Sequence, residues 1–176
     1  MGSSSTKLPF PPTDPSTSIP PQAANLPPDP WLCSSILQKS IRRGDADTAA
    51  DAGVTLHRLR GSSIWTRLLV IAFEDIGAAS PGALVNAVTA CTDIVWRKQA
   101  GGNTAVVASV ARMLADAPKD RSSDYLICTA RGHPSLAETR QRLESLPVKA
   151  RIDMATDATL PVTVRATAAW YASGIE

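Results

Sequence analysis

The distribution of proline divides this sequence of 176 residues into two parts that differ in their capacity to fold. Nine of the 14 prolines lie within residues 1–30, where large apolar residues are few. Proline fixes φ and removes a backbone donor, and a segment with little apolar surface cannot offset the entropy cost of ordering. We therefore predict a disordered or polyproline-like arm over residues 1–30 and one folded domain over residues 31–176.

Signals for the start and the end of helices alternate along the chain beyond residue 30. Asp29-Pro30 places an N-cap residue before a proline at the first helical position, and Gly44 supplies a stop. Apolar residues recur at helical spacing between such signals. The expected helices cover about 30–43, 45–59, 63–76, 81–100, 103–117, 122–130, 134–146 and 161–173.

No stretch alternates strictly between apolar and polar residues, as a half-buried strand would. The nearest case is Val162-Thr163-Val164, but Pro161 and the alanine-rich continuation favour a helix there. The sequence therefore predicts an all-α helical bundle. Gly53 lies inside the second expected helix, where glycine costs about 1 kcal/mol relative to alanine. We expect it to let a neighbouring helix approach closely.

For two of the expected helices the sequence also predicts an apolar face or a cap. In the fourth, Leu84, Val88, Cys91 and Val95 are expected to share one face, and Gly101-Gly102 ends the helix. Asn103 is expected to cap the fifth. The three cysteines are far apart and odd in number, which favours free core thiols over disulfides or a zinc site.

Charge and hydropathy narrow the cellular context. The formal net charge of +2 is too small to argue for nucleic-acid or membrane binding by itself. No apolar run approaches the roughly 20 residues that span a bilayer, and no signal peptide opens the chain. We expect a cytoplasmic protein without stable membrane association. The first residues fit the N-myristoylation pattern with Gly2 as acceptor, but one myristoyl chain would hold a membrane only marginally.

The sequence contains no recognisable catalytic, cofactor or metal motif. It lacks the GxxxxGK[ST] pattern, and Gly101-Gly102-Asn103-Thr104 has neither the lysine nor the preceding strand of a P-loop. His57 and His133 belong to no triad signature, and no cluster of acids has the spacing of a calcium loop. We therefore expect no enzymatic activity, no cofactor and no metal.

The adjacent acids Glu74 and Asp75 lie near the expected end of a helix, just before Gly77. Negative charge at that end opposes the helix dipole, so at least one acid needs a partner. Candidate partners are Arg67, earlier on the same helix, and the N-terminus of the next helix. We expect a structural role for Glu74, Asp75 and Gly77. Neighbouring residues in a helix point about 100° apart, so the two acids do not form the facing pair that acid–base catalysis needs.

Basic residues supply the candidate contacts to a partner or to DNA. One cluster lies at the end of the first helix, and residues 97–151 carry a surplus of five positive charges. Such a surplus could contact phosphates, but few aromatic residues are interleaved to stack on bases, which favours an ordinary solvated face. The candidate residues are Lys39, Arg42, Arg43, Arg67, Arg112, Lys119 and Arg121.

Several motifs in register resemble one protein family over roughly residues 33–130, about half of the chain. They are Lys39-Ser40-Ile41-Arg42 followed by Gly44-Asp45, then Arg67-Leu68-Leu69-Val70-Ile71-Ala72-Phe73-Glu74-Asp75-Ile76-Gly77, then Ser80-Pro81 with Ala83-Leu84, and finally Leu114-Ala115-Asp116-Ala117-Pro118-Lys119. Their order and spacing are similar to those in the C-terminal region of the replication-associated recombination protein A family, which includes the Werner helicase-interacting ATPases.

The resemblance implies a helical fold akin to the collar domain of clamp-loader ATPases. In that family the region assembles subunits, and a separate AAA+ domain, which has no counterpart in this sequence, hydrolyses ATP. The implied function is a non-enzymatic oligomerisation module in DNA replication, recombination or repair. Its implied partners are a second copy of the chain or an ATPase of the family, and the basic surplus over residues 97–151 adds DNA as a secondary candidate. The alternative is an effector or adaptor that uses the helical scaffold for an unrelated partner, with residues 1–30 as a targeting segment.

Overall fold

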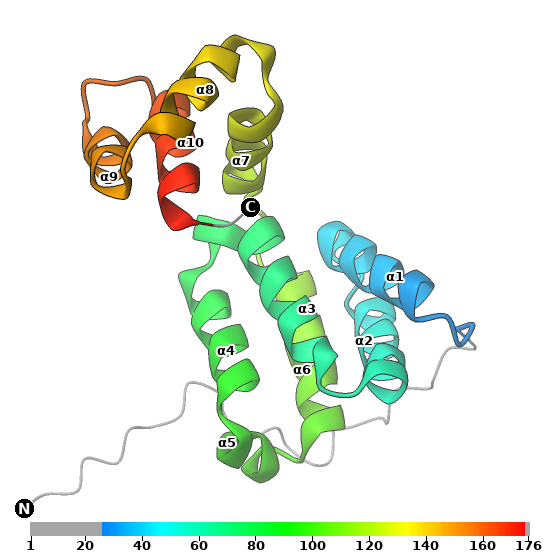
Figure 1. Cartoon of the computed structure of the whole chain (residues 1–176). Coiled ribbons are helices and arrows are strands. Elements are labelled where there is room, and N and C mark those ends of the chain that lie inside the picture. The colour runs from blue at the N-terminus through cyan, green and yellow to red at the C-terminus, as the bar shows by residue number, and fades with distance from the viewer. Residues whose placement is uncertain (1–25, 175–176) are drawn as a thin grey trace, which may run out of the picture. The chain divides into compact units, whose positions relative to one another are not determined.

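The computed structural model of the chain describes residues 26–174, and every regular element in that range is a helix (Figure 1). The all-α prediction is therefore confirmed. The single domain that we expected from residue 31 onward is instead divided into two compact units, the first ending at Asp120 and the second beginning at Arg121. The alanine-rich helices before Asp120 share one apolar core, whereas the short helices after it pack on one another.

Most helices of the two units begin and end at or near the start and stop signals identified in the sequence. The first unit contains α1 (Pro30–Arg43), α2 (Ala46–Arg60), α3 (Ser63–Ile71), the π-helical turn η2 (Ala72–Ile76), the 3₁₀ turn η3 (Gly77–Ala79), α4 (Pro81–Thr92), α5 (Ile94–Gln99) and α6 (Asn103–Asp116). The second unit contains α7 (Ser122–Gly132), the 3₁₀ turn η4 (Pro134–Leu136), α8 (Ala137–Ser145), α9 (Val148–Thr156) and α10 (Val162–Ser173). Of these helices, α9 was not expected.

The start and the end of α1 show the expected capping chemistry. The Asp29 carboxylate accepts hydrogen bonds from the backbone N–H groups of Trp31, at 2.8 Å, and Leu32, at 3.3 Å. Gly44 ends the helix with a φ of +76°, a conformation that glycine adopts at little cost. Asp45 caps α2 by accepting from the N–H of Thr48, and hydrogen bonding with the side chain and the backbone of Thr48 lowers the pKa of the Asp45 carboxyl.

The proline-rich arm ends earlier than the expected boundary at residue 30. Leu26 packs against the core of the first unit, and the carbonyl oxygen of Pro27 accepts a bond from the Cys33 thiol. Pro30 is itself the first residue of α1. Residues 26–30 therefore belong with the folded unit. The remaining part of the expected arm, including the Gly2 myristoylation pattern, lies outside the described residues.

The core of the first unit forms where α2 packs against α1 and α6. Gly53 sits at this contact, where an added Cβ would lie 3.2 Å from Cγ1 of Val107 and 3.6 Å from Cδ1 of Leu37. The close approach expected at Gly53 is therefore confirmed. Small side chains in α2, α4 and α6 bring the helix axes together, and the larger buried residues come mainly from α1 and α3.

Three local predictions were wrong. The fourth expected helix is divided at Asp93, whose carboxylate accepts from the N–H of Trp96 and caps α5. Asn103 is the first residue of α6 instead of its cap, and its side-chain oxygen accepts from Nε of Arg97. Of the three cysteines, Cys33 is buried as expected, whereas Cys128 is exposed because it lies on the outward face of α7.

Gly77 is the residue of the first unit at which a side chain would be most disruptive. Its φ is +51°, and a Cβ there would lie 2.7 Å from the backbone oxygen of Asp120. We predict that Gly77→Ala lowers the free energy of unfolding by about 1–3 kcal/mol, because the strained conformation and the backbone clash act together.

Gly82→Ala is the matched control, because nothing lies within 4 Å of an added Cβ there and its φ is ordinary for a helix. Its free energy of unfolding should equal the wild-type value or exceed it by up to about 1 kcal/mol, because alanine is favoured over glycine in a helix. Urea unfolding of the whole chain followed by circular dichroism measures both. Equal stabilities for the two variants would contradict this view of Gly77.

Candidate interaction surface

A buried carboxylate holds together the part of the first unit from which α4 begins. The Asp75 side chain is fully buried, and its two oxygens accept from Nε of Arg42 at 2.7 Å and from Nε2 of Gln38 at 3.0 Å. The same Gln38 nitrogen lies 3.3 Å from Oε2 of Glu74. A π-helical turn at the end of α3 is thereby tied to α1.

The acids at this turn needed a partner, and the structure supplies one. An arginine does bind Asp75, as expected, but it is Arg42 of α1. Arg67 instead donates to the side-chain oxygen of Gln38. The π-helical turn accounts for part of the difference, because its extra residue rotates Glu74 and Asp75 relative to the register of α3.

The chain after Asp75 is fixed against the end of α6. The backbone N–H of Asp120 donates to the carbonyl oxygen of Asp75 at 3.1 Å, and Gly77 passes directly beneath Asp120. The Lys119 ammonium donates to the carbonyl oxygens of Ala115 and Ala117, which caps the C-terminus of α6. Burial lowers the pKa of Lys119, while the charges of Asp116 and Asp75 act in the opposite direction. These contacts set the position at which α4 starts.

Helix α4 contains no charged residue, yet it lies at one edge of the first unit (Figure 1). Its buried side chains are the alanines Ala83, Ala87 and Ala90, which pack toward α3 and α6. Two valines lie on the opposite side, Val85 with 60% of its surface exposed and Val88 with 38%. The helix is therefore buried on one side only, and its exposed side carries valines together with the uncharged polar residues Thr89 and Thr92.

Exposed apolar residues also occur at the start of α5. Ile94 and Val95, just past the break at Asp93, expose 59% and 65% of their surfaces. We call Val85, Val88, Ile94 and Val95 the α4–α5 face. The threonine hydroxyls between them are satisfied internally, Thr89 by the carbonyl of Val85 and Thr92 by that of Val88, each at 2.9 Å. These two hydroxyls therefore have an acceptor within their own helix.

The face differs from the one expected for the fourth helix. Leu84 and Cys91 do pack partly against the core, but Val88 and Val95 do not. The sequence pattern did not reveal the exposed face, because alanines bury closely packed surfaces without standing out as an apolar stripe. A charge-free helix of twelve residues was the signal that could have indicated it.

Arg97 fixes the relative position of α4 and α5. Its guanidinium is buried, lies 4.5 Å from the ring centroid of Trp65, and donates to the carbonyl oxygens of Ala90 and Cys91 at 2.6 Å and 2.9 Å. These carbonyls are at the end of α4, where cations are favoured by the helix dipole. Arg97 was counted in the basic surplus, but this contact makes it part of the scaffold.

Most of the predicted basic contact residues already have a partner within the chain. Arg42 pairs with Asp75, Arg112 with Asp47, and Arg121 with Asp124, while Arg67 and Lys119 make the bonds described above. Among the described residues, Lys39 and Arg43 are exposed near the end of α1 without such a partner. The structure therefore brings Lys39, Arg42 and Arg43 together on α1, with Arg67 joined to them through Gln38. Arg112 and Lys119 lie elsewhere in the first unit, and Arg121 belongs to the second.

Comparison of the chain with protein-family models and with curated proteins found no match. The resemblance to the ATPase family, and the collar-like arrangement that it implies, stay predictions. Within residues 26–174, no helix combines the length and apolar character needed to cross a bilayer. The same part of the chain contains no group of three or more His, Cys, Asp or Glu side chains placed to hold a metal ion.

We predict that Asp75→Ala lowers the free energy of unfolding by about 2–4 kcal/mol, because it leaves the donors of Arg42 and Gln38 without their acceptor. Arg42→Ala should also destabilise the fold, since it leaves a buried carboxylate short of a cation. The double variant should lose less than the sum of the two single losses. Lys39→Ala is the control on the same helix, with a change within about 0.5 kcal/mol. Strict additivity in denaturant unfolding would show that the pair does not act as a unit.

Proposed function

We propose that this chain is a protein-interaction module that self-associates through the α4–α5 face. The observation that carries the proposal is a charge-free helix at the edge of its unit with exposed valines on its outer side. Scattered exposed apolar residues are normal on a soluble protein. Here four of them lie within residues 85–95, on two consecutive helices, and we infer that they form one surface that another chain covers.

A second copy of the chain is the occupant that this surface suits best. In a two-fold symmetric contact the same patch lies against itself, so any charge on it would face its own like charge. Helix α4 carries none, and the exposed charges nearest to the face in sequence are Asp93, which caps α5, and Lys98. The side chains on the face are β-branched, and such side chains have few rotamers to lose when they are buried. Both properties favour association between copies.

The proposed activity belongs to the same class as the one implied by the family resemblance. We place the module among non-enzymatic oligomerisation domains of the cytoplasm, connected with DNA replication, recombination or repair. An ATPase of the resembled family would be a second partner for the same face. Contact with DNA is a lesser part of the proposal, because internal bonds leave only Lys39 and Arg43 free among the seven predicted contact residues.

The double variant Val85→Asp/Val88→Asp tests the face directly. We expect the wild-type chain to elute as an oligomer in size-exclusion chromatography with light scattering, and the double variant to elute as a monomer. Two carboxylates on each copy would repel across a symmetric contact and would lose solvation on burial. Thermal unfolding of the variant should stay cooperative, since both valines point away from the core of the unit.

Val162→Asp serves as the control, because Val162 is about as exposed (62%) as Val85 (60%) but lies on α10 in the second unit. Its oligomer should resemble that of the wild type. A wild-type chain that is monomeric at every concentration would contradict the proposal. Loss of the oligomer in both aspartate variants would show that added charge, and not the α4–α5 face, controls association.

Binding to DNA provides a separate prediction. If Lys39 and Arg43 contact phosphates, Lys39→Gln/Arg43→Gln should weaken retardation of a DNA duplex, and the affinity of the wild type should fall steeply as salt rises. Arg58→Gln, which removes an exposed cation from α2, is the control. An affinity that does not depend on salt, or no retardation at low salt, would remove DNA from the proposed partners.

A further inference from the structure

Trp31, in the first turn of α1, is the most exposed large apolar residue within residues 26–174. It leaves 79% of its surface in solvent. A tryptophan side chain gains more than most from burial, because it removes a large apolar area from water. An exposed ring of this kind is therefore a surface that a ligand can cover.

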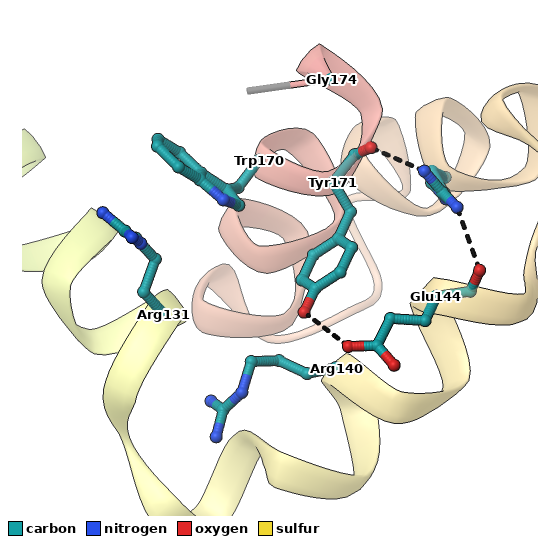
Figure 2. A pocket seen from close by; sticks show the side chains of 7 residues that line it. Arg131, Arg140, Glu144, Trp170, Tyr171 and Gly174 are labelled. Carbon is teal, nitrogen blue, oxygen red and sulfur yellow. Dashed lines mark hydrogen bonds between the residues drawn. The ribbon is translucent and has the colours of Figure 1, made fainter. Parts of the chain in front are cut away.

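The other tryptophans of the described chain are packed. Trp65 and Trp96 are buried in the core of the first unit. Trp170, in the second unit, is half-buried beside Arg131 in the wall of a cavity, with the guanidinium 5.0 Å from its ring centroid (Figure 2). Trp31 is thus the tryptophan that its own unit leaves open.

Arg60 places a positive charge beside the Trp31 ring. Helices α1 and α2 pack against each other, so the last turn of α2 lies beside the first turn of α1 (Figure 1). The guanidinium is 5.9 Å from the ring centroid and covers little of the ring, since Trp31 stays so exposed. Arg60 is itself exposed, and no carboxylate among the described residues pairs with it. This end of the helix pair therefore offers an aromatic ring next to an unpaired cation.

The proline-rich part of the sequence has the chemistry that matches an exposed aromatic ring. Pro9, Pro12 and Pro15 recur at every third residue. Three residues is the repeat of the polyproline II helix, so in that conformation the three prolines share one face. Aromatic surfaces bind such segments in many recognition domains, because the polyproline II helix loses little entropy on binding. These residues lie outside the described part of the chain.

The same segment also carries the charge that matches Arg60. Asp14 is the only acid within residues 1–25. In a polyproline II helix it lies two residues beyond Pro12, which is about 6 Å along the axis. That spacing is comparable with the 5.9 Å between the Trp31 ring centroid and the Arg60 guanidinium. A proline on the ring therefore brings the carboxylate within reach of the cation.

The described chain begins close enough to Trp31 for this segment to return to it. Leu26 packs against the core of the first unit, and the five peptide steps from Leu26 to Trp31 span at most about 18 Å. Residues 16–25 can span about 36 Å, which is sufficient for Pro15 to reach the ring. A tether of this length holds the segment at an effective concentration in the millimolar range, so even a weak contact is occupied.

We propose that residues 9–15 dock on Trp31 of the same chain, with the prolines against the ring and Asp14 paired with Arg60. The docked segment competes with any other proline-rich ligand for the ring, so the chain carries its own competitor for this site. The contact uses no residue of the α4–α5 face and does not depend on self-association.

Fluorine NMR of the full chain labelled with 5-fluorotryptophan tests the docking, and the resonance of Trp31 is assigned with Trp31→Phe. Line broadening by a soluble nitroxide measures how accessible each ring is. Pro12→Ser/Pro15→Ser should raise the broadening of Trp31 at least about twofold, because it releases a ring that is covered at least half of the time. Equal broadening in this variant and in the wild type would overturn the proposal.

Pro20→Ser/Pro21→Ser is the matched control, because it also removes two prolines but leaves residues 9–15 unchanged. It should broaden Trp31 as the wild type does. The same increase in both variants would show that proline content, and not the segment 9–15, protects the ring, and would contradict the assignment. Protection that falls on dilution of the wild type would place the segment on another copy and would overturn docking within one chain.

A charge exchange tests the ion pair. Asp14→Arg and Arg60→Asp should each increase the broadening of Trp31, and the double variant should return it toward the wild-type value, because the pair is restored with reversed polarity. Arg58→Asp, which changes another exposed cation of α2, is the control and should leave Trp31 unchanged. Single effects that simply add in the double variant would contradict the pairing of Asp14 with Arg60.

Discussion

The buried carboxylate of Asp75 is the interaction on which the arrangement of the first unit depends. A charge without solvent is stable only with close partners, and here Arg42 and Gln38 of α1 supply them across the fold. The same stretch of chain accepts a backbone bond from Asp120 and passes beneath it at Gly77. One short segment thus connects the first helix, the π-helical turn and the end of α6, and it determines where α4 can begin.

The position of α4 in turn determines which surface the unit exposes. Its alanines allow close packing on one side, and its valines are left on the other. Arg97 then fixes the turn into α5 by binding the last carbonyls of α4. Helices whose positions are fixed by such bonds have less freedom to lose when a partner covers them. The account of function as an interaction module depends on this chain of contacts.

Much of the first unit could be predicted from the sequence because helix caps are local. Asp29 and Gly44 each act on residues within a few positions, so their roles can be inferred without knowing the fold. The partner of Asp75 could not, because it comes from a helix more than thirty residues away. Helix α9 was missed for a similar reason: it has no buried residue to create an apolar period, and its main support is contact with α10.

The exposed α4–α5 face could not be predicted from the sequence either, because Val88 and Val95 look like core residues until the break at Asp93 is known.

Hydrogen–deuterium exchange over a dilution series measures the central claim most directly, because it reports whether α4 and α5 are covered by another copy. The account predicts slower exchange in α4 and α5 at high protein concentration, with α10 unchanged. Exchange in α4 and α5 that is the same at every concentration would contradict it.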